Sequence, residues 1–357
     1  MNTEGFLQTF ASRLFLDRHF EFWLRELEPM LALREVRARI TDIVAETGDT
    51  KTFVLRPGAR WTGFQAGQYL TIEVDVDGVR IRRCYSISSA PDGGRSLTIT
   101  VKRVATGTVS RWLHDRAKVG DVVTIGPAAG DFVLPDPLPA KLLFVSGGSG
   151  ITPIFSLLLE LAGRGGLADV VVLHYARSHD DVIFREHLAA LADRHPGLRL
   201  ELRHTRGGGS ETRLDEPALQ RVVPDFAERD AFVCGPPALM EEVERIWKRH
   251  GLTARLRRER FVAPTPSIEP GAAGAKITLS RSGTEFQSDG KTTLLEQAER
   301  AGAKPAYGCR RGICHTCKCR KQSGAVQNVV TGEISSEPDE DIQLCISVAR
   351  SDMTIDI

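Results

Sequence analysis

The sequence lacks several features that would direct the chain to a membrane or to a nucleic acid. Among its 357 residues, no uninterrupted apolar run reaches the roughly 20 residues that span a bilayer, and no secretory signal opens the chain. Its 47 basic and 46 acidic residues leave a net charge of +1, and no long run of lysine or arginine is present. We therefore expect a cytoplasmic protein that has no transmembrane segment and binds no nucleic acid.

Residues 1–34 are rich in large apolar side chains, which charged residues interrupt. The helical spacing of these side chains predicts an amphipathic helical leader. Its apolar face is expected either to pack on the body of the protein or to make peripheral contact with the inner membrane face or a membrane-bound partner, and the sequence leaves both open. The apolar positions with this spacing are Phe6, Phe10, Leu14, Phe20, Trp23, Leu24 and Leu27.

Residues 35–137 have an apolar period of two rather than the period of a helix. Short alternating segments such as residues 69–76 are separated by turn signals, among them Pro57-Gly58. Regularly spaced short strands of this kind predict a small antiparallel β-barrel.

Three further segments follow the predicted barrel. In residues 138–262, strand-like stretches alternate with helix-like ones, which predicts an α/β doubly wound domain around a parallel sheet. Residues 263–275 have no periodicity and many Pro and Gly residues, as expected of a linker. Residues 276–357 are expected to form a small mixed α+β domain, so the chain as a whole is expected to be multi-domain.

Four cysteines in the last domain have a spacing typical of a plant-type 2Fe-2S cluster, C-x4-C-x2-C with a distant fourth cysteine. Small residues in the loop, Gly308 and Gly312, let backbone N–H groups turn toward sulfur. A disulfide framework and a structural zinc site remain alternatives, although zinc sites usually have two CxxC-like pairs and only one is present. The predicted ligands are Cys309, Cys314, Cys317 and Cys345.

Two upstream segments offer groups suited to a phosphate and to a flat heterocycle. In R-C-Y-S-I-S-S, Arg83 and Tyr85 share one face of a strand, so a ligand there meets a guanidinium and an aromatic ring together. In G-T-V-S, Gly107 and two hydroxyl residues begin a helix-like stretch, where free N–H groups suit a pyrophosphate. Plain N-capping by Thr108 or Ser110 is the alternative interpretation.

Two loops are expected at one edge of the predicted parallel sheet. The glycine-rich turn G-G-S-G-I-T-P at residues 147–153 follows a buried strand and precedes a helix, a context that favours the approach of a phosphate. It lacks the full GxGxxG spacing, and a simple tight turn is the alternative. The second loop, C-G-P-P at residues 234–237, follows another strand. Together the loops predict a ligand-binding crevice.

These motifs, in this order, resemble those of the ferredoxin-NADP reductase superfamily with a fused C-terminal plant-type ferredoxin domain. The resemblance covers nearly the whole chain from about residue 35. It implies an FAD-binding barrel at residues 35–137, an NAD(P)-binding domain at 138–262 and a 2Fe-2S ferredoxin domain of β-grasp fold at 276–357. It also implies an NAD(P)H:acceptor oxidoreductase, in which electrons pass from NADPH through FAD and the cluster to a protein acceptor.

The same resemblance implies a role for each site residue. Tyr85 would lie against the isoalloxazine and Ser86 near its N5, Cys234 near the nicotinamide, and Glu259 and Phe261 would close the flavin site. Ser86, Cys234 and Glu259 would be the catalytic residues. The implied cofactor-binding residues are Arg83, Tyr85, Ser86 and Phe261 for the flavin, Gly107, Thr108, Val109 and Ser110 for its pyrophosphate, and Gly147, Gly148, Gly150, Thr152, Pro153, Gly235 and Pro236 for the nicotinamide dinucleotide.

The strand end H-Y-A-R-S-H-D-D bears on the choice between NADPH and NADH. Arg177 and Ser178 stand where similar reductases bind the ribose 2'-phosphate, and no acidic residue directly ends the strand. Arg185 would add a second cation. This favours NADPH and leaves NADH open, the alternative being that Arg177 is merely exposed.

The leader and the segments R-P-G-A-R-W and A-G-Q-Y-L make the chain most similar to reductases of membrane-bound diiron enzymes such as fatty-acyl desaturases and alkane hydroxylases. Reductases of phenylacetyl-CoA epoxidases and Rieske dioxygenases are alternatives, as are a cluster-based redox sensor and a zinc-stapled flavin reductase. Basic residues near the cluster loop are expected either to dock an acidic acceptor or to be solvated. They are Arg310, Arg311, Lys318, Arg320 and Lys321.

Overall fold

The computed structural model describes most of the chain from residue 35 onward. The described residues are 30, 35–76, 78–93, 95–206, 213–261, 273–308, 310, 312 and 316–357. The predicted helical leader, most of the predicted linker, and the predicted ligands Cys309 and Cys314 therefore lie outside the described residues. In the part of the chain that is described, no helix is long and apolar enough to cross a membrane.

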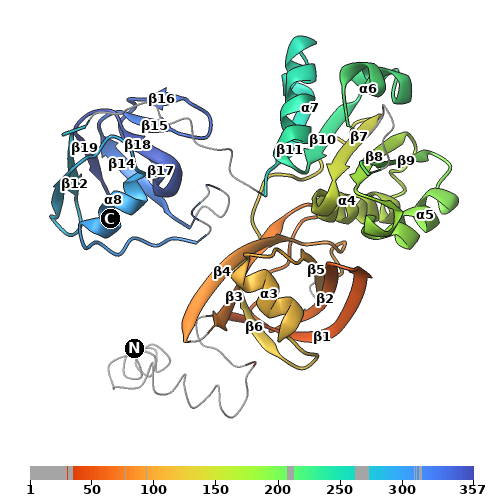
Figure 1. Cartoon of the computed structure of the whole chain (residues 1–357), viewed down its shortest axis with the longest axis horizontal. Coiled ribbons are helices and arrows are strands. Elements are labelled where there is room, and N and C mark those ends of the chain that lie inside the picture. Colours follow the sequence, from red (N-terminus) through yellow and green to blue (C-terminus); the bar gives the residue numbers. More distant parts are fainter. Residues whose placement is uncertain are drawn as a thin grey trace, which may run out of the picture. The chain divides into compact units, whose positions relative to one another are not determined.

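The first domain is an antiparallel six-stranded sheet with the strand order β4-β3-β6-β1-β2-β5. A bridge between Ile87 and Ile99 joins the two ends of this order and closes the sheet, which confirms the predicted barrel. Helix α3 (Thr108–Asp115) lies against the barrel strands (Figure 1). It places Val109 and Leu113 in the barrel core. The strands are β1 (Val36–Thr47), β2 (Thr50–Pro57), β3 (Tyr69–Val76), β4 (Val79–Ser86), β5 (Leu97–Lys102) and β6 (Val122–Ile125).

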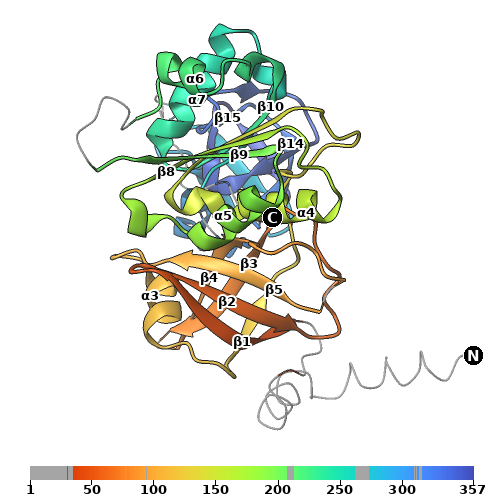
Figure 2. The same cartoon turned by 90° about the vertical axis from the view of Figure 1, so that its right-hand side faces the viewer.

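The second domain is a parallel five-stranded sheet with the order β11-β10-β7-β8-β9, as predicted. Its central strands β7 and β8 are buried on both faces, which explains their continuous apolar sequences. Helices α6 and α7 lie on one side of the sheet, and α4 and α5 on the other (Figure 2). The elements are β7 (Leu142–Gly147), α4 (Ile151–Gly163), β8 (Val170–Ala176), α5 (Arg185–Arg194), β9 (Leu198–His204), α6 (Glu216–Val222), β10 (Asp230–Cys234), α7 (Pro237–Arg249) and β11 (Leu256–Glu259).

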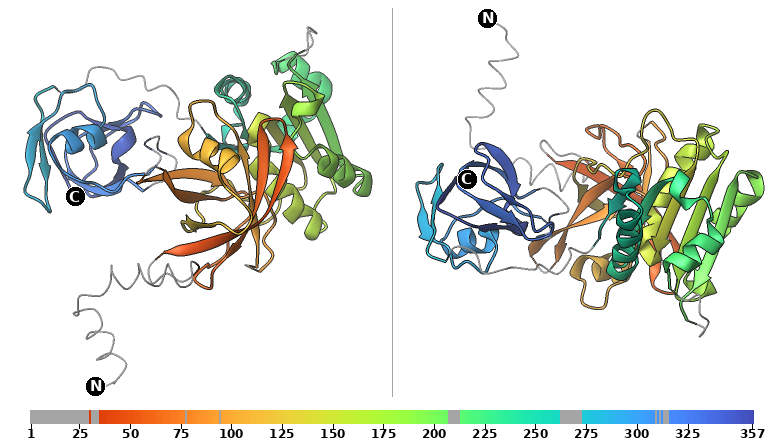
Figure 3. Two further views of the ribbon diagram at one scale, coloured as in Figure 1. Left: turned by 60° about the horizontal axis from the view of Figure 1, so that its bottom comes forward. Right: turned by 90° about the horizontal axis from the view of Figure 1, so that it is seen from above.

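The C-terminal domain combines a five-stranded mixed sheet, a three-stranded sheet and one helix, in agreement with the predicted α+β class. Helix α8 (Leu294–Arg300) lies among the strands of this domain (Figure 3). It buries Leu294 and Leu295 in the same core as the strand residues Ile277 and Ile355. The strands are β12 (Lys276–Leu279), β13 (Glu285–Gln287), β14 (Lys318–Ser323), β15 (Val326–Asn328), β16 (Ile334–Ser335), β17 (Glu340–Gln343), β18 (Ser347–Ala349) and β19 (Met353–Ile355).

The described residues form two compact units, of which one holds the barrel and almost all of the parallel-sheet domain and the other the C-terminal domain. Within the first unit, Ser156 of α4 connects the two domains. Its hydroxyl donates to the carbonyl oxygen of Ser89 at 2.6 Å and accepts a hydrogen bond from the backbone N–H of Gly67 at 3.2 Å. Barrel and sheet are thus joined beside the carboxyl edge of β7.

Candidate functional site

The two loops predicted to form a crevice do lie side by side at the carboxyl edge of the parallel sheet. A Cβ atom on Gly150 would collide with the carbonyl oxygen of Cys234, and one on Gly235 would lie 2.9 Å from the backbone nitrogen of Gly147. Both positions therefore require glycine for the loops to approach each other. Pro236 follows at an exposed position before α7.

The turn after β7 presents its backbone to open space. Gly148 has a φ angle of +53°, which favours glycine, and no heavy atom lies within 4 Å of where its Cβ would be. No side chain caps the short 3-10 helix Gly148–Gly150 or the helix α4 that follows. The Thr152 hydroxyl donates to the carbonyl oxygen of Ser149 at 3.0 Å, and Pro153 is buried. The uncapped 3-10 helix that leads into α4 therefore places its backbone N–H groups where an anion could meet them.

Buried polar residues stand in register beneath these loops. Ser146 of β7 pairs with His174 of β8 on one side and with Cys234 of β10 on the other, and Cys234 pairs with Glu259 of β11. The Ser146 hydroxyl lies 2.7 Å from Nδ1 of His174. Burial lowers the pKa of His174 to about 4 and raises the pKa of the Cys234 thiol, so both side chains are neutral near pH 7.

The end of β4 carries the residues expected to meet a flavin. Tyr85 is partly buried against the barrel core, and this burial raises the pKa of its hydroxyl. Arg83 is exposed, and its Nη1 donates to the carbonyl oxygen of Arg82 at 2.7 Å. Ser86 is buried at the end of the strand. The Arg83 guanidinium thus lies at the barrel surface, and Tyr85 lies against the core two residues later on the same strand.

The start of α3 has no side-chain cap, so the alternative of capping by Thr108 or Ser110 is wrong. Gly107 occupies the N-cap position, and the hydroxyl of Ser110 accepts instead from the backbone N–H of Val104 at 3.2 Å. Thr108 is exposed, whereas Val109 and Ser110 are buried. The first-turn N–H groups therefore remain open to an anion.

Two buried polar atoms at the ends of β4 and β11 have no hydrogen-bond partner of good geometry among the described residues. They are Oγ of Ser86 and Oε2 of Glu259. Part of Glu259 reaches the surface, but burial of its carboxyl group raises the pKa to about 8, an effect that the nearby Ser86 partly offsets. Buried polar groups are normally satisfied. The orphaned pair therefore fits a bound ring that itself carries donors and acceptors, as a flavin does. Phe261, two residues after β11, is half-buried.

Arg177 and Ser178, which follow β8, are both paired with an acidic side chain in the structure. Arg177 and Ser178 lie together, but each bonds Asp181: Arg177 Nη2 at 2.5 Å and the Ser178 hydroxyl at 2.8 Å. No acidic residue directly follows the strand, yet folding also brings Asp49 of the barrel to within 2.7 Å of Arg177. Arg185 begins α5, and its Nη1 lies 2.8 Å from Nδ1 of His179.

The two described cysteines of the predicted cluster site come together in the C-terminal domain. Cys317 and Cys345 are buried, and the backbone N–H of Cys345 points at the Cys317 sulfur at 3.5 Å. The N–H of Gly312 donates to the Cys345 sulfur at 3.2 Å. Gly312 has a φ of +77°, and a Cβ there would lie 2.8 Å from the Ile346 side chain. Sulfur atoms that accept backbone hydrogen bonds suit an iron–sulfur cluster.

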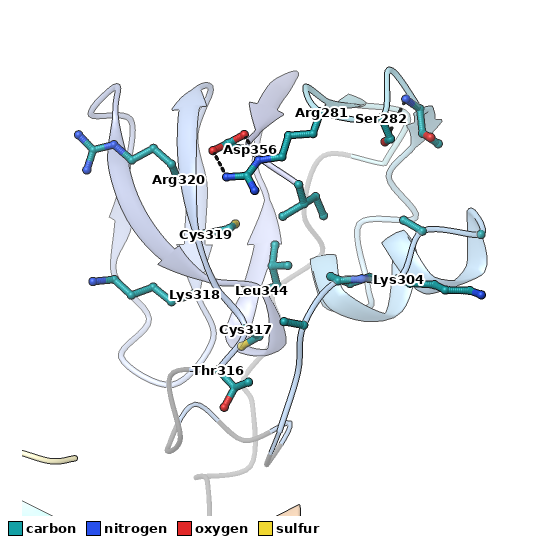
Figure 4. A pocket seen from close by; sticks show the side chains of 16 residues that line it. Arg281, Ser282, Lys304, Thr316, Cys317, Lys318, Cys319, Arg320, Leu344 and Asp356 are labelled. Atoms are coloured by element: carbon teal, nitrogen blue, oxygen red, sulfur yellow. Dashed lines mark hydrogen bonds and ion pairs between the residues drawn. The ribbon is translucent and has the colours of Figure 1, made fainter. Parts of the chain in front are cut away.

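A pocket of about 580 Å³ lies beside these cysteines. Cys317 and Cys319 both line it. Arg281, which also lines it, forms a bidentate ion pair with Asp356 (Figure 4). Among the described residues, the other cations that line this pocket are Lys304, Lys318 and Arg320.

The predicted basic group near the cluster loop is largely neutralised. Lys321 is fully buried, where it pairs with Glu340 at 2.6 Å, so the expectation that it contacts an acceptor or solvent is wrong. Lys318 and Arg320 both pair with Asp341. Arg310 is bound in a bidentate ion pair by Glu299, and Arg311 lies outside the described residues.

Fold and site together define an oxidoreductase with a flavin-type barrel, a dinucleotide-binding domain and an iron–sulfur domain. Three family models match the chain: an oxidoreductase FAD-binding domain at residues 37–133, an oxidoreductase NAD-binding domain at 144–245 and a 2Fe-2S iron-sulfur cluster binding domain at 277–350. The chain belongs to the ferredoxin-NADP reductase superfamily, in the group with a fused C-terminal 2Fe-2S ferredoxin domain. It is an oxidoreductase that uses FAD, NAD(P)H and a 2Fe-2S cluster.

Individual relatives extend this similarity over the whole length. The chain is 38% identical over 355 residues to an NADPH oxidoreductase of Mycobacterium tuberculosis, which covers 98% of this chain and 92% of the relative. It is 33% identical to the glycine betaine monooxygenase reductase subunit of Pseudomonas aeruginosa, covering 89% and 94%. The solved structure of phthalate dioxygenase reductase superposes with a TM-score of 0.63 at 26% identity, covering 90% of this chain and 97% of that one.

Proposed function

We propose that this chain is the reductase component of an oxygenase system, which passes electrons from NADPH through FAD and a 2Fe-2S cluster to an oxygenase. In this proposal residues 35–137 bind FAD, residues 138–262 bind the nicotinamide nucleotide, and residues 276–357 carry the cluster beyond a linker at 263–275. The observation that carries it is the orphaned pair Ser86 and Glu259 beside the glycine loops of the crevice. A cluster-based sensor would need neither this pair nor the two glycine loops.

An oxygenase is favoured as the acceptor over the desaturase by the names of two similar proteins, a glycine betaine monooxygenase reductase subunit and a phthalate dioxygenase reductase. A membrane-bound diiron acceptor and a peripheral membrane contact remain predictions from the sequence, because the leader lies outside the described residues.

The residues of the barrel would bind and orient FAD. Tyr85 offers an aromatic face, Arg83 a cation and the open start of α3 a site for the pyrophosphate, while Phe261 would cover the ring. When bound, FAD accepts two electrons from the nicotinamide and returns them one at a time to the cluster. Glu259, with a pKa of about 8, is protonated at neutral pH and can hold or release a proton at its carboxyl group.

The crevice residues would receive the nicotinamide nucleotide. The phosphates would lie on the backbone of Gly147, Gly148 and Gly150 at the start of α4, where Thr152 and Pro153 fix the turn. Cys234 would stand beside the nicotinamide as a neutral thiol, because its burial disfavours the thiolate. Gly235 and Pro236, in the loop after β10, would contact the nucleotide from the opposite side. Arg177, Ser178 and Arg185 would lie near the ribose 2'-phosphate.

The direct test of this function compares two acceptors. Ferricyanide takes electrons from a reduced flavin, whereas cytochrome c stands in for a one-electron protein acceptor served by the cluster. We expect NADPH to drive the reduction of both by the purified holoprotein. If cytochrome c were reduced at the same rate after removal of the cluster, the proposed route through the cluster would be wrong.

The substitution Gly150→Ala is expected to raise the KM for NADPH about tenfold or more, because the new Cβ would push apart the two loops of the crevice. Steady-state kinetics would measure this, with flavin content checked by absorbance. Gly163→Ala is the matched control, since it lies in the same helix region and a Cβ there meets no atom within 4 Å. Equal effects of both substitutions would contradict the role of Gly150.

The substitution Gly312→Ala is expected to make the cluster dissociate about tenfold faster, because it strains a left-handed backbone and displaces the N–H that bonds Cys345. The decay of visible absorbance in the presence of a chelator would measure this. Gly332→Ala is the matched control: its φ is also +77°, but a Cβ there meets no atom within 4 Å. A cluster equally stable in both variants would contradict the assigned hydrogen bond.

A further inference from the structure

One guanidinium nitrogen at the proposed 2'-phosphate site is shared by carboxylates from two domains. Nη2 of Arg177 donates to Asp181 in the 3-10 turn His179–Asp181 and to Asp49 in the turn between β1 and β2. Asp49 is 128 residues away in the sequence and belongs to the barrel. The side chain of Arg177 is still 41% exposed, so its remaining N–H groups can meet a ligand.

The carboxylate of Asp49 is held firmly in place. Its Oδ1 accepts hydrogen bonds from the hydroxyls of Thr47 and Thr50, both at 3.1 Å, and Nζ of Lys102 lies 3.0 Å from Oδ2. Partial burial opposes ionisation, but Lys102 and Arg177 outweigh it and lower the pKa of Asp49 to about 2. Asp49 is therefore negatively charged throughout the working pH range.

These ion pairs neutralise the positive charge that would attract a phosphate. Arg177 and Lys102 contribute two positive charges, and Asp49 and Asp181 two negative ones. Arg185, the other cation predicted here, is paired with Asp180 at 3.4 Å. The hydroxyl proton of Ser178 is engaged by Asp181 and is not available to a ligand. A phosphate monoester carries about −1.5 to −2 charges near pH 7. Directional donors are thus present, but the net attraction for a 2'-phosphate is weak.

We propose that Asp49 is a specificity-determining residue, which lowers the affinity for the ribose 2'-phosphate and so lets NADH compete with NADPH. The proposal rests on the proposed function, because it takes Arg177 as the ligand of that phosphate. In a partly exposed site, repulsion between the Asp49 carboxylate and a phosphate bound to the same guanidinium changes the Kd on the order of tenfold. A ribose with a free 2'-hydroxyl carries no charge at this position, so Asp49 does not repel it.

The test is Asp49→Asn in the holoprotein, because Asn keeps the shape and one acceptor oxygen for Thr47 and Thr50 while removing the charge. Calorimetry with adenosine 2',5'-bisphosphate and with AMP isolates the 2'-phosphate. We expect Kd for the bisphosphate to fall about tenfold and Kd for AMP to stay unchanged. The ratio of the KM values for NADPH and NADH should fall by the same factor. Asp42→Asn is the control, since its carboxylate accepts only from the Ile43 N–H among the described residues.

Unchanged or weaker binding of the bisphosphate to the Asp49→Asn variant would overturn the proposal, the weaker binding showing that Asp49 orients Arg177 instead. Arg177→Gln separates this failure from that of the proposed function. If Arg177→Gln weakens bisphosphate binding and Asp49→Asn does not strengthen it, only the role of Asp49 is wrong. If Arg177→Gln changes neither the bisphosphate nor the AMP affinity, the 2'-phosphate site itself is wrongly placed.

Discussion

We expect Cys345→Ser to lower NADPH-driven reduction of cytochrome c at least 100-fold while leaving ferricyanide reduction nearly unchanged. The Cys345 sulfur is buried and accepts the Gly312 N–H, and its own backbone N–H points at the sulfur of Cys317. Replacing one of the four predicted thiolate ligands by a hydroxyl would remove a ligand that soft iron–sulfur chemistry requires. Tyr85, Ser86 and Glu259, which are proposed to meet the flavin, lie in the other compact unit and are unchanged.

Cys319→Ser provides the matched control for this result. Cys319 lies two residues after Cys317 and lines the same pocket, but it is outside the ligand pattern. The control should keep the visible spectrum of the cluster and the rate with cytochrome c. Loss of the cluster in the Cys319→Ser variant, or its retention in the Cys345→Ser variant, would show that the ligand set is wrong.

Glu259→Gln is expected to slow the reduction of the flavin by NADPH about 100-fold, because a positioned acid or base typically contributes this much. Burial holds the pKa of Glu259 at about 8, so the carboxyl group is protonated at neutral pH. Gln keeps the size and neutrality of the group but cannot exchange a proton. Stopped-flow absorbance of the flavin measures the rate directly.

The pH dependence of that rate has a definite sign. Below pH 8 the raised pKa keeps Glu259 protonated, and above it the proton is lost, so the wild-type rate should fall as pH rises through about 8. The Glu259→Gln variant should show no such fall. The control Glu241→Gln changes an exposed side chain on α7 and should behave as the wild type. A variant that kept the wild-type fall would assign it to another group.

The elements with clear apolar periodicity were predictable. The alternating strand β6, the first half of β1 and the apolar strands β7 and β8 bury their side chains as their patterns indicate. Strand β11 was not recognised, because three of its four residues in L-R-R-E are charged and it lies at the edge of the sheet, where exposure is tolerated. The resemblance drew attention to Glu259 without revealing the strand that carries it.

The site was predictable where local geometry demands a residue type and not where distant segments meet. Gly150 and Gly312 could be read from sequence because a close approach or a positive φ requires glycine. The ion pair of Asp49 with Arg177 leaves no local signal. The burial of Lys321 did have a local signal. Lys321 lies two residues after Cys319 in β14, so the alternation of side chains along a strand puts both on the inward face.

The order of electron transfer can be measured by anaerobic rapid mixing of the holoprotein with NADPH, with the flavin followed by absorbance and the reduced cluster by electron paramagnetic resonance after rapid freezing. We expect the flavin to lose its absorbance first and the signal of the reduced cluster to appear afterwards, in flavin-containing protein only. A reduced-cluster signal that arose equally fast in flavin-free protein, or no such signal once the flavin was fully reduced, would contradict the route from nicotinamide through flavin to cluster.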